Sequence, residues 1–191
     1  MKSSLVTYIN SGKYKGKKIL LPPLTTTRGT KSIIRESFFN VVQFDIIGKN
    51  FVEVFAGSGS MGLEALSRGA KKIYFIEKDH QAYKVLLQNI RNFECNSCEA
   101  INADSFEEFY GLLDKIDGKT YFYFDPPFEI REGMEDIYKK VFGLIKRIPS
   151  QICELIALEF MSGVDIPENI GVYHLVKSKK FGKTTISYFK Y

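Results

Sequence analysis

A short aromatic stretch followed by Asp125-Pro126-Pro127-Phe128 carries the clearest chemistry in this sequence. Four consecutive aromatic residues at 121–124 are typical of a short buried strand, and the two prolines end it. Asp125 therefore falls at the carboxyl end of that strand, where open α/β sheets bind ligands. A carboxylate, a carbonyl fixed by proline and the flat face of Phe128 suit a planar amino group. Such a site would hold an exocyclic nucleobase amine and draw its lone pair out of conjugation.

A glycine-rich turn supplies a second binding element. The stretch from Gly57 to Gly62 matches the G-x-G-x-x-G pattern between a predicted strand and a predicted helix, and Glu77 lies twenty residues after Gly57. This is the dinucleotide fingerprint, in which the later acid binds ribose hydroxyls. Glu53, at the centre of the preceding strand, would be poorly placed beside a pyrophosphate. It suits instead a cationic ligand that carries an amino group and a sulfonium.

Asp104 follows a third predicted strand, at the same sheet edge as Glu77 and Asp125. Its carboxylate could accept a hydrogen bond from an adenine amino group. It could equally cap the helix that begins near Phe106, since aspartate is a preferred N-cap residue. The two interpretations are compatible, and the sequence leaves both open.

Groups at strand ends meet only if the strands share one sheet. From residue 50 onward, short apolar strands alternate with helices. Seven strands are predicted, at Phe51–Phe55, Lys72–Ile76, Glu99–Asn102, Tyr121–Phe124, Glu154–Phe160, Tyr173–Ser178 and Thr184–Tyr191. This alternation with short connections predicts an α/β fold with a mostly parallel sheet covered on both faces. The last two strands predict an antiparallel hairpin at one edge.

The N-terminal part departs from this pattern. Two β-prone pieces, Leu5–Ile9 and Lys18–Leu21, surround a basic turn and predict a loose strand pair ahead of a helix at Ser32–Val42. Residues 1–40 hold eight Lys or Arg against one acid, a net charge of +7, whereas residues 41–191 total −2. The asymmetry favours a polyanion-binding arm on a near-neutral body. An ordinary solvated surface is the alternative.

Composition sets further limits. A chain of 191 residues, 45% of them hydrophobic, suits one domain with a full-sized core. No segment approaches the roughly eighteen apolar residues of a membrane helix, and the N-terminus lacks the apolar region of a signal peptide. Three cysteines, Cys95, Cys98 and Cys153, are few and odd in number, which predicts reduced thiols in a cytoplasm. The C-x-x-C spacing at 95–98 has no second pair, and no metal site is predicted.

The combination of these segments resembles class I S-adenosylmethionine-dependent methyltransferases. The resemblance rests on Glu53–Gly59, Gly62–Ala70, Ile76-Glu77, Asp104 and Asp125–Phe128. More closely, the chain is similar to the RsmD type, the bacterial 16S rRNA guanine-N2 methyltransferases. Gly12–Lys18, Arg28 and Arg35–Asn40 resemble the basic N-terminal arm and first helix of that family, and the similarity extends from about Ile9 to Tyr191.

The resemblance implies a Rossmann-like methyltransferase domain at residues 31–191 behind a basic, RNA-binding β extension at residues 1–30. It implies methyl transfer from S-adenosylmethionine to the exocyclic N2 of one guanine in 16S rRNA, within the small ribosomal subunit or its precursor, without a metal. The residues implied are Asp125, Pro126, Pro127 and Phe128 for catalysis; Glu53, Phe55, Ala56, Gly57, Gly59, Glu77, Lys78, Asp104 and Ser105 for the cofactor; and Lys13, Lys15, Lys17, Lys18, Arg28, Lys31 and Arg35 for RNA.

Three alternatives share parts of these patterns. An adenine-N6 methyltransferase of DNA or RNA would use the same motif around Asp125, although the DNA enzymes usually carry a separate target-recognition domain. A protein glutamine methyltransferase would share the chemistry without needing a basic arm. A non-catalytic RNA-binding protein of the same fold would tolerate loss of the cofactor motifs, which are intact here.

Overall fold

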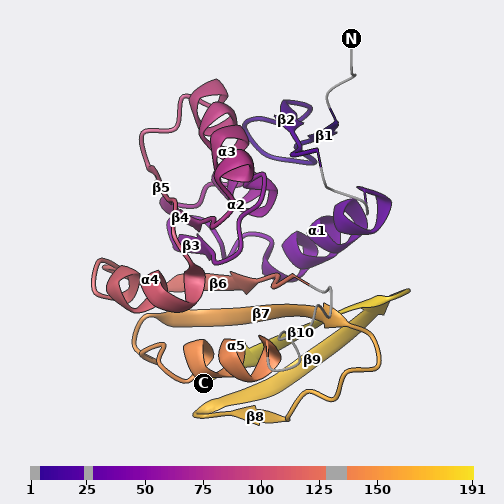
Figure 1. The fold of residues 1–191 in the computed structure, drawn as a ribbon, viewed down its shortest axis with the longest axis vertical. Helices are drawn as coiled ribbons and strands as arrows, with labels where there is room; N and C mark the ends of the chain where they lie inside the picture. The colour runs from indigo at the N-terminus through magenta and orange to yellow at the C-terminus, as the bar shows by residue number, and fades with distance from the viewer. Residues whose placement is uncertain (1–4, 24–27, 128–136) are drawn as a thin grey trace.

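The computed structural model describes residues 5–23, 28–127 and 137–191, with only the backbone described at 28–30. Within these ranges an eight-stranded sheet runs in the order β5-β4-β3-β6-β7-β10-β9-β8 (Figure 1). The strands are β3 (Asn50–Glu53), β4 (Lys72–Ile76), β5 (Cys98–Ile101), β6 (Thr120–Phe124), β7 (Cys153–Met161), β8 (Asn169–Ile170), β9 (Tyr173–Phe181) and β10 (Thr184–Lys190). Strands β3 to β7 pair in parallel, and β8, β9 and β10 pair antiparallel.

The predicted fold is therefore confirmed, with one small difference. The short β8 pairs with the start of β9 and raises the predicted seven strands to eight among the described residues. Two residues are too few to show an alternating pattern, so this strand could not be predicted from hydrophobic periodicity.

Helices cover both faces of the sheet. They are α1 (Arg28–Val42), α2 (Ser60–Ser67), α3 (His80–Asn92), α4 (Ser105–Leu113) and α5 (Ile137–Ile145). One apolar core lies between the sheet and α1, α2 and α3, and a second lies between the sheet and α4 and α5. Strand β6 serves both cores, because Tyr121 and Tyr123 face the first while Phe122 and Phe124 face the second. Its carboxyl end is thereby fixed from both sides.

The N-terminal extension is docked on this domain. Strands β1 (Val6–Tyr8) and β2 (Lys18–Leu20) form a separate antiparallel pair. Glu64 of α2 accepts hydrogen bonds from the backbone N–H groups of Asn10 and Ser11, at 2.8 and 3.1 Å. Asn89 of α3 bonds both the N–H and the carbonyl of Leu20, each at 2.9 Å. The extension therefore packs as part of the fold. Helix α1 also begins earlier than predicted, at Arg28 instead of Ser32.

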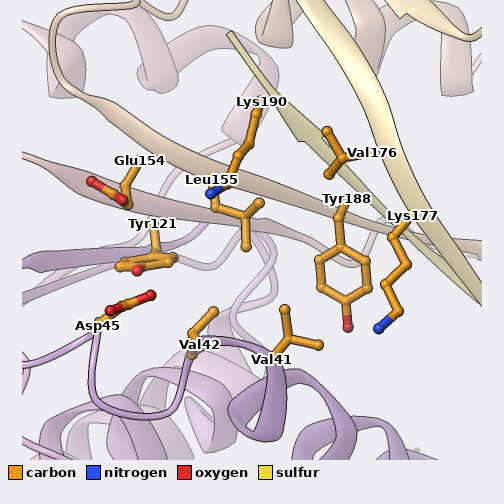
Figure 2. Close-up of a pocket in the computed structure, with 10 residues that line it drawn as sticks. All are labelled: Val41, Val42, Asp45, Tyr121, Glu154, Leu155, Val176, Lys177, Tyr188 and Lys190. Carbon is orange, nitrogen blue, oxygen red and sulfur yellow. The ribbon is translucent and has the colours of Figure 1, made fainter.

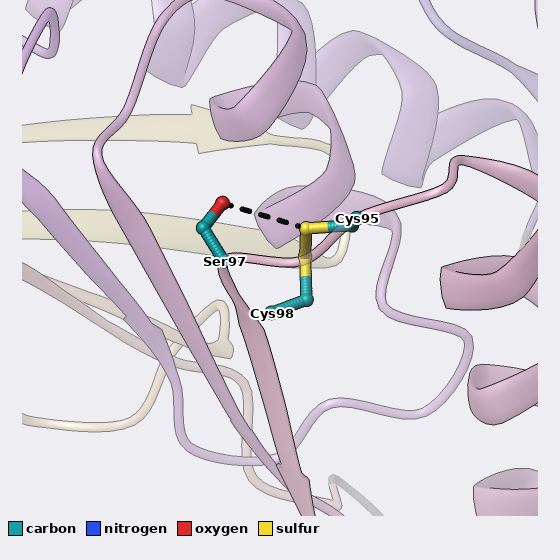
Figure 3. The surroundings of a disulfide bond; sticks show 3 residues. All are labelled: Cys95, Ser97 and Cys98. Atoms are coloured by element: carbon teal, nitrogen blue, oxygen red, sulfur yellow. Dashed lines mark hydrogen bonds between the residues drawn. A yellow bond between two sulfur atoms is a disulfide. The ribbon is translucent and has the colours of Figure 1, made fainter.

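A disulfide joins Cys95 and Cys98 in the turn that leads from α3 into β5 (Figure 3). The prediction of reduced thiols is therefore wrong for this pair, while Cys153 is a free, buried thiol. The physical reason is local, since the turn brings the two Cα atoms to 5.5 Å, within the usual span of a disulfide. Composition alone carried no information about that turn.

No helix in the described ranges is long and apolar enough to cross a membrane. In the same ranges, the His, Cys, Asp and Glu side chains form no group of three or more that could hold a metal ion.

Candidate active site

The turn between β3 and α2 forms one wall of the candidate site. Gly57 and Gly59 have φ angles of 53° and 77°, which glycine adopts readily. A Cβ atom at Gly59 would lie 2.4 Å from Cδ1 of Leu86, so a side chain has no room there. A Cβ atom at Gly57 would meet nothing within 4 Å. The backbone at Gly57 is consequently open to a ligand that approaches closely.

Glu53 lies buried at the end of β3 and lines a pocket together with Gly57 of this turn. Its carboxylate accepts hydrogen bonds from the N–H groups of Gly62 at 2.8 Å and Met61 at 3.3 Å, in the first turn of α2. Burial raises the pKa of Glu53 to about 8, against the opposing effect of these two bonds. An arriving cation would favour the ionised form. The acid thus both anchors α2 and remains a candidate partner for a cationic ligand.

Glu77 directly follows β4 and lies across from the glycine turn. One carboxylate oxygen accepts from the N–H of Gly57 at 2.6 Å, and the other accepts from the N–H of Asp79 at 2.7 Å. Burial raises the pKa of Glu77 above its usual value. The acid is thereby held at the edge of the sheet with one oxygen against the glycine turn, as the fingerprint predicts.

Asp104 lies at the next strand end. Its carboxylate accepts from the N–H of Phe106 at 2.9 Å, which confirms the N-cap interpretation, and it pairs with Lys78 at 2.7 Å. Burial alone would raise the pKa of Asp104, but Lys78 and the capping bond outweigh burial and hold it below its usual value. The hydroxyl of the adjacent Ser105 is buried and donates to the carbonyl of Val54. Ser105 therefore ties the start of α4 to the residue that follows β3, and it lies outside the pocket lining.

Asp125 follows β6, as predicted, and its side chain is mostly buried. Its Oδ2 atom lies 2.8 Å from Nζ of Lys31, in the second turn of α1. The attraction of Asp125 raises the pKa of Lys31 well above its usual range, although burial opposes this. Pro126 is buried and Pro127 is exposed. Phe128, the fourth catalytic residue predicted, lies outside the described residues.

Glu159 is a pocket residue that sequence reasoning missed. It lies on β7, is buried, and lines the pocket that also holds Lys31 and Asp125. Its Oε1 accepts a hydrogen bond from the hydroxyl of Tyr123, whereas its Oε2 has no hydrogen-bond partner among the described residues. Burial, reinforced by the charge of Asp125, raises the pKa of Glu159 to about 8. An acid inside the otherwise apolar run from 155 to 160 was the signal that could have revealed it.

One pocket thus unites many of the predicted residues. Its lining includes Lys31, Arg35, Glu53, Phe55, Ala56, Gly57 and Asp125. Glu77, Lys78 and Asp104 are not among the lining residues but lie along the same sheet edge, at the ends of β4 and β5. This arrangement can hold an extended ligand across the strand ends and present its reactive end to Asp125.

A second cavity, of about 190 Å³, lies elsewhere (Figure 2). It is lined from the ends of α1 and β10, the beginnings of β6 and β7, and Val176 and Lys177 of β9. Asp125 lies at the opposite end of β6. This cavity contains none of the predicted site residues, so we do not assign the active site to it.

The basic residues predicted for RNA contact divide into two groups. Lys13, Lys15 and Lys18 are exposed on the extension, and Lys17 lies over the ring of Phe93, 4.9 Å from its centroid. Arg35, by contrast, is only 2% exposed.

Arg35 takes its partners within the protein. Its guanidinium donates to the carbonyl of Tyr8 at 2.7 Å and to the side chain of Asn10 at 3.0 Å, and it lies 3.7 Å from Glu64. Arg35 therefore joins the extension to α1 and α2. Because its side chain is buried and already paired, we do not propose it as an RNA contact. For Arg28, only the backbone is described.

Strands that end in a glycine turn and an acid-Pro-Pro motif, with helices on both faces, define the class I methyltransferase fold. The family model described as Conserved hypothetical protein 95 matches residues 7–190. Ribosomal RNA small subunit methyltransferase D of Haemophilus influenzae is 31% identical over 151 residues, covering 76% of this chain and 70% of its own length. The chain belongs to this RsmD family of methyltransferases.

Solved structures agree with this assignment. The Escherichia coli protein yhhF, named as a methyltransferase, superimposes with a TM-score of 0.76 at 25% identity and covers 97% of each chain. The Haemophilus influenzae protein HI0767, named as a methylase, gives a TM-score of 0.70 at 28% identity, with 97% of this chain and 98% of that chain covered. The resemblance seen in the sequence is thereby confirmed at the level of family and fold.

Proposed function

We propose that this chain transfers a methyl group from S-adenosylmethionine to the exocyclic N2 of a guanine in 16S rRNA. The observation that carries this proposal is the carboxylate of Asp125 at the end of β6, in one pocket with Gly57 and Glu53. Relatives named as ribosomal RNA small subunit methyltransferases support RNA as the substrate. The partner would be the small ribosomal subunit or its precursor, in the cytoplasm.

The residues present fit S-adenosylmethionine. The open backbone at Gly57 allows close approach of the ligand. Glu77 offers acceptor lone pairs for ribose hydroxyls, and Asp104 offers an acceptor oxygen for the adenine amine. Glu53 would face the cationic end of the ligand. When bound, this cofactor would supply a methyl group attached to a positively charged sulfur.

The chain's own residues would prepare the amine. Asp125 and the carbonyl of Pro126 accept hydrogen bonds from the two N–H groups of the amine. These bonds turn the lone pair of the amine toward the methyl carbon. The nitrogen–carbon bond would form as the carbon–sulfur bond of the bound cofactor breaks, and the electron pair of the broken bond would remain on sulfur. Asp125 would stabilise the positive charge that develops on nitrogen, and the nitrogen would then release one proton to solvent. Neither a metal nor a nucleophilic side chain takes part in this scheme.

The target base would be recognised at the same place. Glu159, whose Oε2 has no described partner, lies beside Asp125 and could bond the ring edge next to the amine. Phe128 would stack on the base after it has flipped out of its helix or loop. Lys13, Lys15, Lys17, Lys18 and Lys31 would contact phosphates near the target.

Product identification tests this function. Small subunits that lack the modification are incubated with the purified chain and cofactor labelled in the methyl group, and the rRNA is then digested to nucleosides. We expect the label in N2-methylguanosine. Label in N6-methyladenosine or in protein would reject guanine N2 as the acceptor and would favour one of the other amine substrates.

A further inference from the structure

The C-terminal hairpin of β9 and β10 carries a second concentration of positive charge. Residues 169–191 contain five lysines and no acid, a net charge of +5, whereas residues 41–168 total −7. The lysines are Lys177, Lys179, Lys180, Lys183 and Lys190, and all five are exposed. The near-neutral net charge of residues 41–191 is therefore the sum of an acidic region and a basic region.

The strand register places the tip of this hairpin at the sheet edge that holds Asp125. Thr184, at the start of β10, lies opposite Met161, the last residue of β7. On the neighbouring β6, Phe124 immediately precedes Asp125 and lies opposite Leu158 of β7. The hairpin therefore extends past the carboxyl end of β7 (Figure 1). This is the sheet edge at which Asp125 follows β6.

The lysines of the hairpin are not neutralised by described residues. No described carboxylate forms an ion pair with any of the five. Lys179 is held locally, because its Nζ donates to the hydroxyl of Ser37 at 3.0 Å and lies 5.0 Å from the centroid of the Phe181 ring. Lys177 lines the cavity at the end of β6 away from Asp125. The ammonium groups of Lys180 and Lys183, at the tip of the hairpin, remain available to an external anion.

We propose that Lys180 and Lys183 form a hairpin surface that binds the phosphate backbone of RNA next to the target nucleotide. Lysine ammonium groups bind phosphate as point charges and carry no base selectivity of their own. The surface therefore contributes affinity and orientation, while the pocket selects the base. This inference rests on the proposed function, because the partner is the RNA substrate.

The position of the pocket supports a bipartite contact. Thr7 and Leu21 of the N-terminal extension line one side of it, and Glu159 of β7 lines the side that leads through β10 to the hairpin. RNA that delivers a base to Asp125 would pass between two basic elements. A substrate held on both sides of the target cannot rotate away from the carboxylate.

The test compares two variants with the same loss of charge. One carries Lys180→Gln and Lys183→Gln; the control carries Lys84→Gln and Lys146→Gln, which are also exposed. Lys179 is left intact because it bonds α1. Affinity for unmodified small subunits is measured against salt concentration, together with KM, kcat, cofactor affinity and thermal unfolding.

We expect the hairpin variant to flatten the slope of log affinity against log salt by about 1.5 and to raise KM, because each engaged lysine contributes roughly 0.7 to 0.9 to that slope. Its kcat, cofactor affinity and unfolding temperature should match those of the control. A slope and KM equal to the control values would overturn the inference. So would weaker binding to vesicles of anionic lipid with RNA affinity unchanged. If the product is not N2-methylguanosine, the proposed function fails, while a loss of RNA affinity in the hairpin variant still supports the surface.

Discussion

Three side chains share one small region at the end of β6, and their charges depend on one another. Asp125 is paired with Lys31, and the nearby Glu159 is buried with one oxygen that has no hydrogen-bond partner among the described residues. An amine that binds Asp125 must share or displace the ammonium group of Lys31, so this ion pair sets part of the free energy of substrate binding. The cluster therefore holds the carboxylate that we propose binds the amine in place before substrate arrives.

At the residue scale, Glu77→Ala should weaken binding of S-adenosylmethionine by about 1.5–3 kcal/mol, the usual contribution of a hydrogen bond to a charged group. Glu77 lies against the glycine turn, where ribose hydroxyls are expected. Calorimetry measures this change, with the exposed Glu168→Ala as the matched control. Unchanged affinity in Glu77→Ala, or tight binding of NAD by the wild type, would refute the assignment.

Glu159→Gln should make stability less sensitive to pH. The folded-state pKa of about 8 lies above the ordinary value of 4.5, so between these values the folded chain keeps a proton that the unfolded chain has lost. Wild-type stability should therefore fall as pH rises through this window and level off above it. Thermal unfolding at pH 5 and pH 8.5 measures this pH dependence in both proteins. The variant should keep part of it, because the pKa of Glu53 is also raised to about 8. An identical pH dependence in variant and wild type would show that Glu159 does not titrate in this way.

At the scale of elements, the N-terminal extension is a structural part of the domain. Ile9 and Ile19 belong to the core beneath α1, α2 and α3, and Glu64 is fully buried between the extension, Arg35 and Arg68. Deleting the extension would therefore expose apolar surface and remove two of the hydrogen bonds that the buried Glu64 accepts. A truncated chain cannot separate RNA binding from folding, and substitutions at exposed lysines are the better probe.

Glu64→Ala should destabilise the fold by about 3–5 kcal/mol, because it leaves the buried guanidinium of Arg35 without its carboxylate. Two backbone N–H groups of the extension also lose their acceptor. Urea unfolding measures the loss, and the exposed Glu36→Ala, on α1, should stay within about 0.5 kcal/mol of wild type. Equal midpoints for the two variants would contradict the docking of the extension through Glu64.

The sequence predicted elements whose pattern is local and long enough to be read. The alternation of strands and helices, the position of Asp125 at a strand end and the cap at Asp104 all follow from short-range signals. What it could not predict depends on contacts between distant residues. Arg35 pairs with Glu64 across α1 and α2, and no local feature distinguishes it from a surface arginine. Glu159 shares a pocket with Asp125 only because β6 and β7 are neighbours.

At the scale of the whole molecule, positive charge lies on two elements on either side of the pocket, with an acidic body between them. Replacing four lysines of the extension by Gln should flatten the slope of log RNA affinity against log salt by about three, because each lysine contributes roughly 0.7 to 0.9 to that slope. The four are Lys13, Lys15, Lys17 and Lys18. Lys71, Lys84, Lys115 and Lys146, all exposed, give a control of equal charge. Filter binding across a salt series measures both, and equal slopes would remove the extension from the RNA interface.

The most direct measurement of the central claim is single-turnover methyl transfer to unmodified small subunits by wild type and Asp125→Ala. Removing an acceptor aimed at developing charge typically costs about a hundred- to a thousandfold in rate. The variant should fold, bind S-adenosylmethionine and RNA nearly as wild type does, and form N2-methylguanosine at least about a hundredfold more slowly. Transfer at the wild-type rate by Asp125→Ala would contradict the assignment of the reactive carboxylate and the mechanism built on it.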